Sequence, residues 1–239
     1  MSLNFDLYKS SGKVPCAPGA MRVKTCRLIM NPGSEDLLSD NIFGRIRLLH
    51  PRLWLPELFR AAYPHKDLPA FDYDKFDLGF WPKVPPMLFK TGVSEFDIFI
   101  TVSPVKIVIE CKYGAPVDED QIRRYLNLLA YRYYRSCCQD VHFILVTNTD
   151  HEPEELSKYK NIDTLAGTIE IRRLHVNYKK LYLNLAGNIG WLSWGKILSI
   201  IEAIPTATLH YSEQQIIDVL IEYLRFKIKG EKPKECLLW

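Results

Sequence analysis

Apolar residues recur along the chain with two different periods, and these periods predict the order of its secondary-structure elements. Leu38, Ile42 and Ile46 are spaced as on one face of a helix, whereas residues 141–148 form a continuous apolar run typical of a buried strand. The predicted elements are, in chain order, helices over 34–49 and 55–62, strands over 95–102 and 105–112, a helix over 118–137, strands over 141–148 and 168–176, and helices over 193–203 and 212–229. This order predicts an α/β (α+β) fold with a central mixed sheet flanked by helices.

The polar and Pro-rich residues 63–92 predict a long connection with one short strand over 87–90. A connection of this length is uncommon in a compact domain unless it has a function, so a functional loop and a variable insertion both stay open. The last helix is expected to open with a capping box formed by Ser212 and Gln215.

The most apolar long run, residues 185–204, contains Asn188, Lys196 and Glu202. These polar residues favour a packed core helix over a membrane span, and no membrane partner is expected. Trp191 and Trp194 in this run are expected in the core rather than on a surface that stacks bases.

Composition indicates a globular protein of ordinary make-up. The 239 residues are 47% hydrophobic and 25% charged, and the net charge of +3 neither demonstrates nor excludes a nucleic-acid partner. The six cysteines lack CxxC spacing, which argues against a zinc site and favours a reducing, cytoplasmic location. The expected organisation is an irregular segment over 1–33, a core over 34–180, and a C-terminal helical extension over 181–239 that packs on the same domain.

The two adjacent strands over 95–112 carry charged residues inside runs that otherwise suit burial. A hairpin that turns at Ser103-Pro104 would pair residues whose numbers sum to 207. Asp97 would then face Glu110, and Glu95 would face Lys112. Because side chains alternate between the two faces of a strand, all four would lie on one face at the end opposite the turn. A shift of one residue would separate the two carboxylates.

Facing carboxylates destabilise a strand pair unless something holds them together. Mg²⁺ or Mn²⁺ would do so, because carboxylate oxygens are ligands that these ions prefer. Lys112 beside them would orient a water or stabilise developing negative charge. The alternative is a surface salt bridge between Glu95 and Lys112 that has no chemical role.

The Asp97 strand followed by Ile109-Glu110-Cys111-Lys112 resembles the PD-(D/E)XK nuclease superfamily, which has an Asp on one strand and (D/E)xK on the next. Here Phe96 stands where that signature has Pro. The order of elements is similar to the αβββαβ core of its restriction-endonuclease-like fold. The resemblance covers residues 34–148, and the first strand of the core would come from residues 87–92.

Two further segments carry the resemblance. Residues 34–49 resemble the family's N-terminal helix, which often supplies an additional acid, and Glu35 is the candidate, with Asp36 second. Gln121 holds the position of a Gln that approaches the site from the following helix. The alternatives are a helix-dipole role for Glu35 and an exposed helical Gln at 121.

The resemblance implies a metal-dependent nuclease that hydrolyses phosphodiester bonds of nucleic acid, expected to be DNA. The implied ligands of Mg²⁺ or Mn²⁺ are Asp97, Glu110, the Cys111 carbonyl and Glu35. The ion would lower the pKa of a bound water and neutralise charge that develops on the phosphate. Lys112 would position that water or stabilise charge, and Gln121 would orient Lys112 or the water.

Basic side chains near this edge would contact phosphates, and the candidates are Arg124, Arg132, Arg135 and Lys106, with Arg123 beside them. The alternative for the arginines is a solvated helix face. Two other functions stay open for the whole protein. One is a catalytically idle nuclease-like fold that binds nucleic acid or serves in assembly, and the other is a homodimer through the helices over 193–229.

Overall fold

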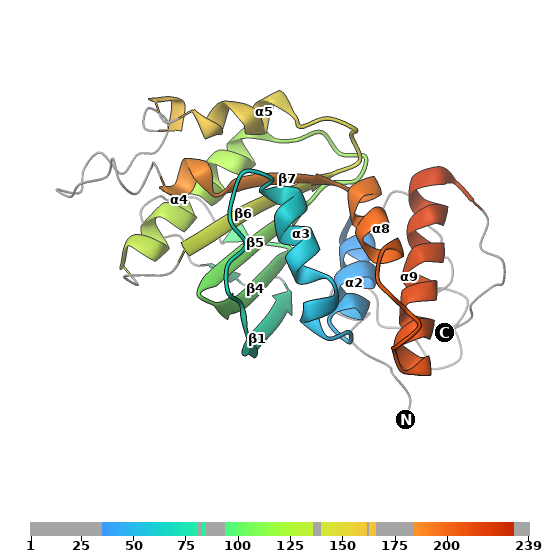
Figure 1. Ribbon diagram of the computed structural model, residues 1–239. Helices are drawn as coiled ribbons and strands as arrows, with labels where there is room; N and C mark the ends of the chain where they lie inside the picture. Colours follow the sequence, from blue (N-terminus) through green and yellow to red (C-terminus); the bar gives the residue numbers. More distant parts are fainter. Residues whose placement is uncertain are drawn as a thin grey trace, which may run out of the picture.

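The protein has an α+β fold built on one five-stranded mixed sheet (Figure 1). The computed structural model describes residues 35–80, 83–84, 94–135, 140–161, 163–165 and 184–231, with side chains at 38–80, 96–129, 140–161, 163–165 and 184–231. In spatial order the sheet contains β1 (Asp72–Phe80), β4 (Ile98–Ser103), β5 (Val105–Cys111), β6 (Asp140–Thr147) and β7 (Ile189–Ser193). The pairs β1–β4 and β4–β5 are antiparallel, and the pairs β5–β6 and β6–β7 are parallel.

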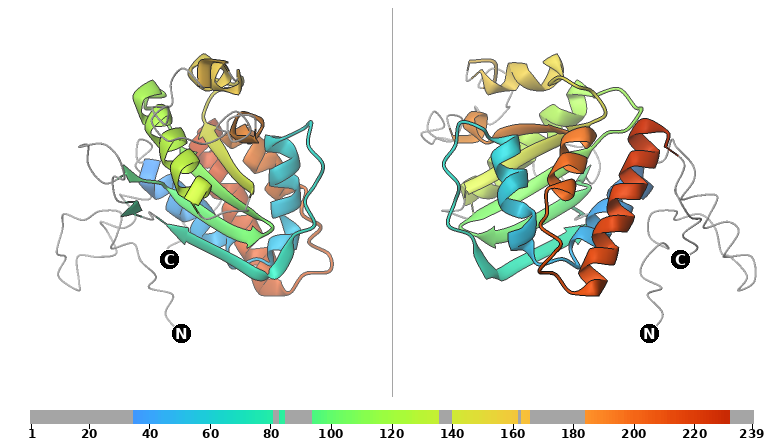
Figure 2. Two further views of the ribbon diagram at one scale, coloured as in Figure 1. Left: turned by 90° about the vertical axis from the view of Figure 1, so that its left-hand side faces the viewer. Right: turned by 45° about the vertical axis from the view of Figure 1, so that its right-hand side comes forward.

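Helices cover both faces of this sheet, as the left view of Figure 2 shows. One face is covered by α2 (Glu35–Ile46), α3 (Leu55–Ala62), α8 (Trp194–Glu202) and α9 (Tyr211–Lys229). The other face is covered by α4 (Glu119–Arg135) and the short α5 (Glu154–Ser157). The predicted central mixed sheet flanked by helices is therefore confirmed. Among the described residues, no helix has both the length and the apolar character needed to cross a membrane.

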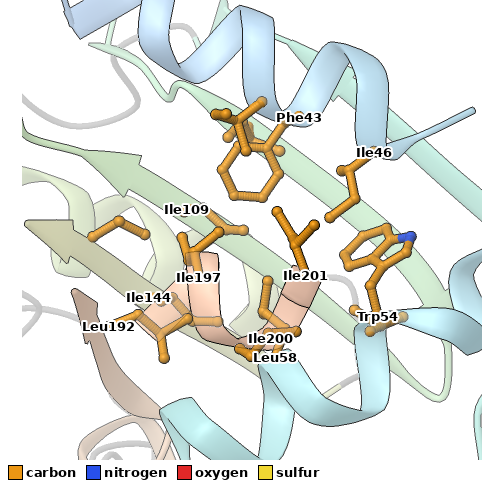
Figure 3. Close-up of a cluster of buried hydrophobic side chains, with 14 of the residues drawn as sticks. Phe43, Ile46, Trp54, Leu58, Ile109, Ile144, Leu192, Ile197, Ile200 and Ile201 are labelled. Atoms are coloured by element: carbon orange, nitrogen blue, oxygen red, sulfur yellow. The ribbon is translucent and has the colours of Figure 1, made fainter. Parts of the chain in front are cut away.

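The larger hydrophobic core lies between the sheet and the four helices of the first face (Figure 3). Phe43 from α2, Ile109 from β5 and Ile197 and Ile201 from α8 meet there. Each such side chain contributes about 1.5–3 kcal/mol when it is fully buried. The apolar residues of α8 and α9 belong to this same core, so these C-terminal helices pack directly on the sheet unit.

The β4–β5 hairpin has the predicted register. Val102 pairs with Val105, Ile100 pairs with Ile107, and Ile98 pairs with Ile109, so the residue numbers of each pair sum to 207. Ser103 and Pro104 form the two-residue turn between the strands, and the peptide bond between them is cis. Side chains that are even-numbered on β5 face α4, and those that are odd-numbered face the larger core.

The predicted first strand over 87–92 is wrong as the partner of β4, because β1 (Asp72–Phe80) occupies that place. Among the described strands β1 pairs with β4 alone, at the edge of the sheet, and it carries exposed Asp74, Lys75 and Asp77. Charged residues are common on edge strands, where they discourage pairing with other chains. These charges gave the segment the composition of a loop. The bulge between Asp72 and Asp77 also interrupts the regular pairing of the strand.

Three other expectations are corrected. Residues 185–204 do not form one helix, because β7 (Ile189–Ser193) precedes α8. The capping box of α9 is formed by His210 and Glu213 rather than by Ser212 and Gln215. Glu95 does not pair with Lys112, because it belongs to β3 (Ser94–Glu95), which pairs with β2 (Lys83–Val84) in a separate sheet. A bend at Asp97 separates β3 from β4.

Other expectations lie outside the described residues. The irregular segment over 1–33, the short strand over 87–90 and the strand over 168–176 are among them. The helices predicted over 34–49, 55–62, 118–137, 193–203 and 212–229 correspond to α2, α3, α4, α8 and α9, with ends that differ by at most a few residues.

Replacing Gly190 by Ala should destabilise the protein by about 1–3 kcal/mol, the usual cost of overpacking. An added Cβ at Gly190 would lie 2.7 Å from Cε1 of Tyr63 and 3.0 Å from the Ala62 carbonyl oxygen. Tyr63 cannot move freely, because its hydroxyl shares its one hydrogen between the Phe143 and Asn188 carbonyls, at 3.0 and 3.1 Å.

Urea unfolding of Gly190→Ala and Gly79→Ala beside the wild type measures this effect. Gly79 also lies in a strand, and a Cβ there would meet nothing within 4 Å. We expect only the Gly190 variant to unfold at a clearly lower urea concentration. Equal midpoints for the two variants would show that the β7–α3 contact is not tightly packed.

Candidate active site

Asp97 and Glu110 come together at the open end of the β4–β5 hairpin. Asp97 lies in the bend before β4, and its Oδ2 accepts a hydrogen bond from the Cys111 N–H at 2.7 Å. The carboxylate thus takes the place of a backbone carbonyl where the β4–β5 ladder ends. Its negative charge also raises the pKa of Glu110. The confirmed register therefore brings the two predicted carboxylates into one local environment.

Glu110 is 3% exposed and lies at the centre of the site. Its Oε1 contacts Nζ of Lys112 at 3.0 Å and accepts from Nε2 of Gln121 at 2.7 Å. Its Oε2 is buried and has no hydrogen-bond partner within the described part of the chain. Burial and the charge of Asp97 raise the pKa of Glu110 to about 8, although Lys112 acts in the opposite direction. A buried carboxylate oxygen without a partner is costly, which makes it a natural ligand position for a cation.

Lys112 follows β5 and returns its side chain toward the strand to reach Glu110. The side chain is 15% exposed. Its backbone N–H donates to the Val146 carbonyl at 2.7 Å, and its carbonyl accepts from Nε1 of Trp194 at 3.1 Å. The amine therefore lies next to Glu110, on a side chain that is not fully buried.

Gln121 approaches the same carboxylate from the first turns of α4, as the resemblance implied. Its Nε2 donates to Oε1 of Glu110 at 2.7 Å and to the hydroxyl of Tyr125 at 2.8 Å. An amide NH₂ group has two hydrogens, so both contacts can form together.

Tyr125 is a residue of the site that the sequence did not point to as functional. It lies one helical turn after Gln121, is buried, and also hydrogen-bonds Glu110. Burial and the nearby charge of Glu110 raise the pKa of Tyr125 well above its usual range, so the phenol keeps its proton as a donor. The spacing of four residues on one helix face was the available signal, but an aromatic on an apolar stripe is usually a core residue.

The structure places the other implied ligands, Glu35 and Cys111, at the site less clearly than Asp97 and Glu110. Glu35 is the first residue of α2, and its side chain is outside the described ones. The Cys111 thiol points to the opposite face of the sheet, where it contacts the Ser39 hydroxyl and lies in the larger core. Burial raises the pKa of this thiol well above its usual range. Only its carbonyl, as the resemblance implied, is left for a role at the site.

The candidates for phosphate contact lie on α4 and β5. Arg124 is exposed on α4, and the neighbouring Arg123 pairs with Asp120 at 2.9 Å. Lys106 lies four residues before Glu110 on β5, which is about 13 Å along an extended strand. The remaining two candidates, Arg132 and Arg135, belong to α4, but their side chains are outside the described ones. A phosphate-binding surface made by these residues stays a prediction.

The described residues supply part of the ligand set that a hard divalent cation needs. Within the described residues there is no group of three or more His, Cys, Asp or Glu side chains that could hold a metal ion. Two carboxylates are present, however, and one of their oxygens is buried and without a hydrogen-bond partner there. Oxygen donors of this type suit Mg²⁺ or Mn²⁺ better than a soft metal. These ions commonly keep several waters, so two carboxylates are a workable protein contribution.

Comparisons with known proteins leave the family open. The sequence matches no protein-family model, and it matches no curated protein. A solved structure of AF1548, a protein of unknown function, is similar over 65% of this chain and 91% of that chain, with 18% sequence identity and a TM-score of 0.25. A similarity this weak supports no inference about fold or function, so the function has to be inferred from the site itself.

Proposed function

We propose that the protein is a metal-dependent nuclease with a restriction-endonuclease-like αβββαβ core, and that its substrate is DNA. The observation that carries this proposal is Glu110, a buried carboxylate that contacts Lys112 and Gln121 and lies beside Asp97. With α3 and the short β2 and β3 set aside, the order α2, β1, β4, β5, α4, β6 also agrees with that core. A structural salt bridge alone would not explain why Oε2 of Glu110 is buried without a hydrogen-bond partner among the described residues.

Asp97 and Glu110 would hold the cation, with the Cys111 carbonyl and Glu35 as further candidates. A bound Mg²⁺ or Mn²⁺ supplies a water of lowered pKa and offsets negative charge on the phosphate. Lys112 would hold the attacking water or the phosphate oxygen through its three N–H donors, because its amine contacts Glu110 and its side chain is not fully buried. Gln121 and Tyr125 would keep the Glu110 carboxylate in place by donating to it.

One observation favours the alternative of an idle nuclease-like fold. Oε1 of Glu110 is already engaged by Lys112 and by Gln121, so part of the site is satisfied without a metal. In this alternative the fold would bind nucleic acid, or serve in assembly, without cleaving it. The predicted homodimer through the C-terminal helices is a separate question that light scattering can answer.

Incubation with supercoiled, linear double-stranded and single-stranded DNA, and with RNA, tests the proposal. We expect cleavage with Mg²⁺ or Mn²⁺ and none with EDTA. Lys112→Met, which keeps the stem and removes the charge, should cleave at least about 10²-fold more slowly, because a positioned charge at the phosphate is lost. Lys196→Met, at an exposed position of α8, is the control that leaves the site intact.

Fluorescence anisotropy with the same nucleic acids separates the two functions. Binding without metal-dependent cleavage of any substrate would support the idle fold. Cleavage that is equal in wild type and Lys112→Met would show that a contaminant, or another site, is responsible.

A further inference from the structure

The backbone around Lys112 is held by elements far away in the sequence. The Lys112 N–H donates to Val146 on β6 at 2.7 Å, and the Lys112 carbonyl accepts from the indole N–H of Trp194 on α8 at 3.1 Å. The next residue, Tyr113, donates its hydroxyl hydrogen to the carbonyl of Lys227 on α9. Both C-terminal helices therefore contact the segment that carries the candidate catalytic amine.

These contacts hold residues 112–118, a segment that is not held by a helix or strand of its own. β5 ends at Cys111, and residues 112–118 form an irregular connection to α4 that includes Gly114 at a φ of 91°. Connections of this kind move more than the strands and helices that they join, unless other groups hold them. The direction of the Lys112 side chain depends on the φ and ψ of that residue, and these angles are fixed when both its N–H and its carbonyl are bonded.

Trp194 is well suited to hold that carbonyl. It is 0% exposed and its ring packs against Phe43, with ring centroids 6.4 Å apart. It is the first residue of α8, and the preceding Ser193 caps the helix by accepting from the Lys196 N–H at 3.1 Å. The indole N–H is thus a preorganised donor, and a buried indole N–H usually needs a partner.

We propose that Trp194 is a positioning residue, which places the Lys112 amine beside Glu110 by holding the Lys112 carbonyl. This inference rests on the proposed nuclease function. It makes α8 and α9 parts of the site, rather than an appendage to a core that is complete without them. It also gives a role to an indole N–H that lies 82 residues from its acceptor in the sequence.

Trp54 provides a matched control. It is also 0% exposed, and its Nε1 has no hydrogen-bond partner among the described residues. Trp194→Phe and Trp54→Phe remove the same atoms from the same hydrophobic core, so both leave an apolar cavity. Only the first removes a hydrogen bond to Lys112. An effect of core packing should appear in both variants, and an effect of positioning should appear in Trp194→Phe alone.

Two measurements test the proposal. The first is the rate at which acetic anhydride acylates Lys112 in the full-length, metal-free protein, followed by mass spectrometry relative to the other lysines. We expect this rate to rise several-fold in Trp194→Phe, because the amine leaves Glu110 more often, and to stay at the wild-type value in Trp54→Phe. The second is DNA cleavage, in which kcat should fall by about 10-fold or more in Trp194→Phe with little change in KM, because misplacing a reacting group slows the chemical step.

Equal Lys112 acylation in the two variants, or equal losses of kcat, would overturn the proposal and leave Trp194 a core residue. If the wild type cleaves no nucleic acid, the nuclease function fails, but the acylation measurement still decides whether Trp194 positions Lys112. The two failures are therefore distinguishable.

Discussion

Glu110→Gln is expected to remove metal-dependent cleavage and, at alkaline pH without metal, to make the protein more stable. Gln keeps the shape of the side chain but cannot supply a negative oxygen to Mg²⁺ or Mn²⁺. Losing several kcal/mol of metal-assisted catalysis would lower the cleavage rate by about 10³-fold or more.

The gain in stability follows from the raised pKa of Glu110. Burial, and then the charge of Asp97, raise this pKa from 4.5 to about 8. Between these values the folded protein binds a proton that the unfolded chain has lost. The stability from this group is therefore fully present below pH 4.5 and is lost as pH rises through about 8. Each pKa unit corresponds to about 1.4 kcal/mol, so the glutamine variant should exceed the wild type by up to several kcal/mol above pH 8.

Urea unfolding at pH 4.5 and pH 8.5, with EDTA or with excess Mg²⁺, measures these effects. We expect Glu110→Gln to be more stable than the wild type at the higher pH in EDTA. Mg²⁺ should stabilise the wild type but not Glu110→Gln, because binding to the folded state adds to its stability. Glu202→Gln is the control, since Glu202 is an exposed carboxylate paired with Arg225 at 2.7 Å. If both glutamine variants respond to pH and to Mg²⁺ in the same way, Glu110 is not a metal ligand.

The sequence was sufficient to bring Asp97 near Glu110, because two properties of strands are strict. Side chains alternate with a period of two, and a turn of fixed length sets the pairing. The two-residue turn at Ser103-Pro104 then determined the rest of the hairpin. The expected pairing of Asp97 with Glu110 is not part of the ladder, however, because Asp97 lies in the bend before β4. Helices with strong apolar periodicity, such as α4, were predictable for the same reason.

The sequence was misleading where tertiary position decides the residue type. β1 lies at the edge of the sheet and carries charges that are typical of loops, and β7 has a glycine where the ring of Tyr63 leaves no space for a Cβ. Glu95 was assigned to the hairpin because a bend within an apolar run leaves no clear mark in the sequence. At β7 a neighbour distant in the sequence, Tyr63, determined the residue type.

The site could be predicted only as far as local geometry extends. Glu110, Lys112 and Gln121 lie close together in the sequence, and the structure brings them into contact. Trp194 was expected to be a core residue, which it is, and Tyr125 is buried as well. Each also uses its polar atom at the site. A buried aromatic residue with a hydrogen-bonding tip fills both roles, and only the fold shows where the tip points.

A second large effect of pH is expected at the opposite end of β6, where His142 lies. This side chain is 2% exposed, and its ring centroid lies 4.9 Å from those of Phe59 and Tyr63. Within the described residues neither ring nitrogen has a hydrogen-bond partner. Burial, and then the charge of Lys66, lower the pKa of His142 from 6.5 to about 3. The folded protein therefore keeps this ring neutral over a range in which the unfolded chain binds a proton.

The stability that His142 contributes should be complete above pH 6.5 and should be lost as pH falls toward 3. His142→Phe keeps the aromatic packing and removes the titration, so its unfolding free energy should fall less steeply with acid, by up to several kcal/mol in total. Urea unfolding at pH 7, 5.5 and 4 measures the difference, with His151→Phe at an exposed position as the control for the replacement. Carboxylates titrate in all three proteins and cancel in the comparison. Parallel curves for His142→Phe and the wild type would mean that the pKa of this ring is the same in the folded protein as in the unfolded chain.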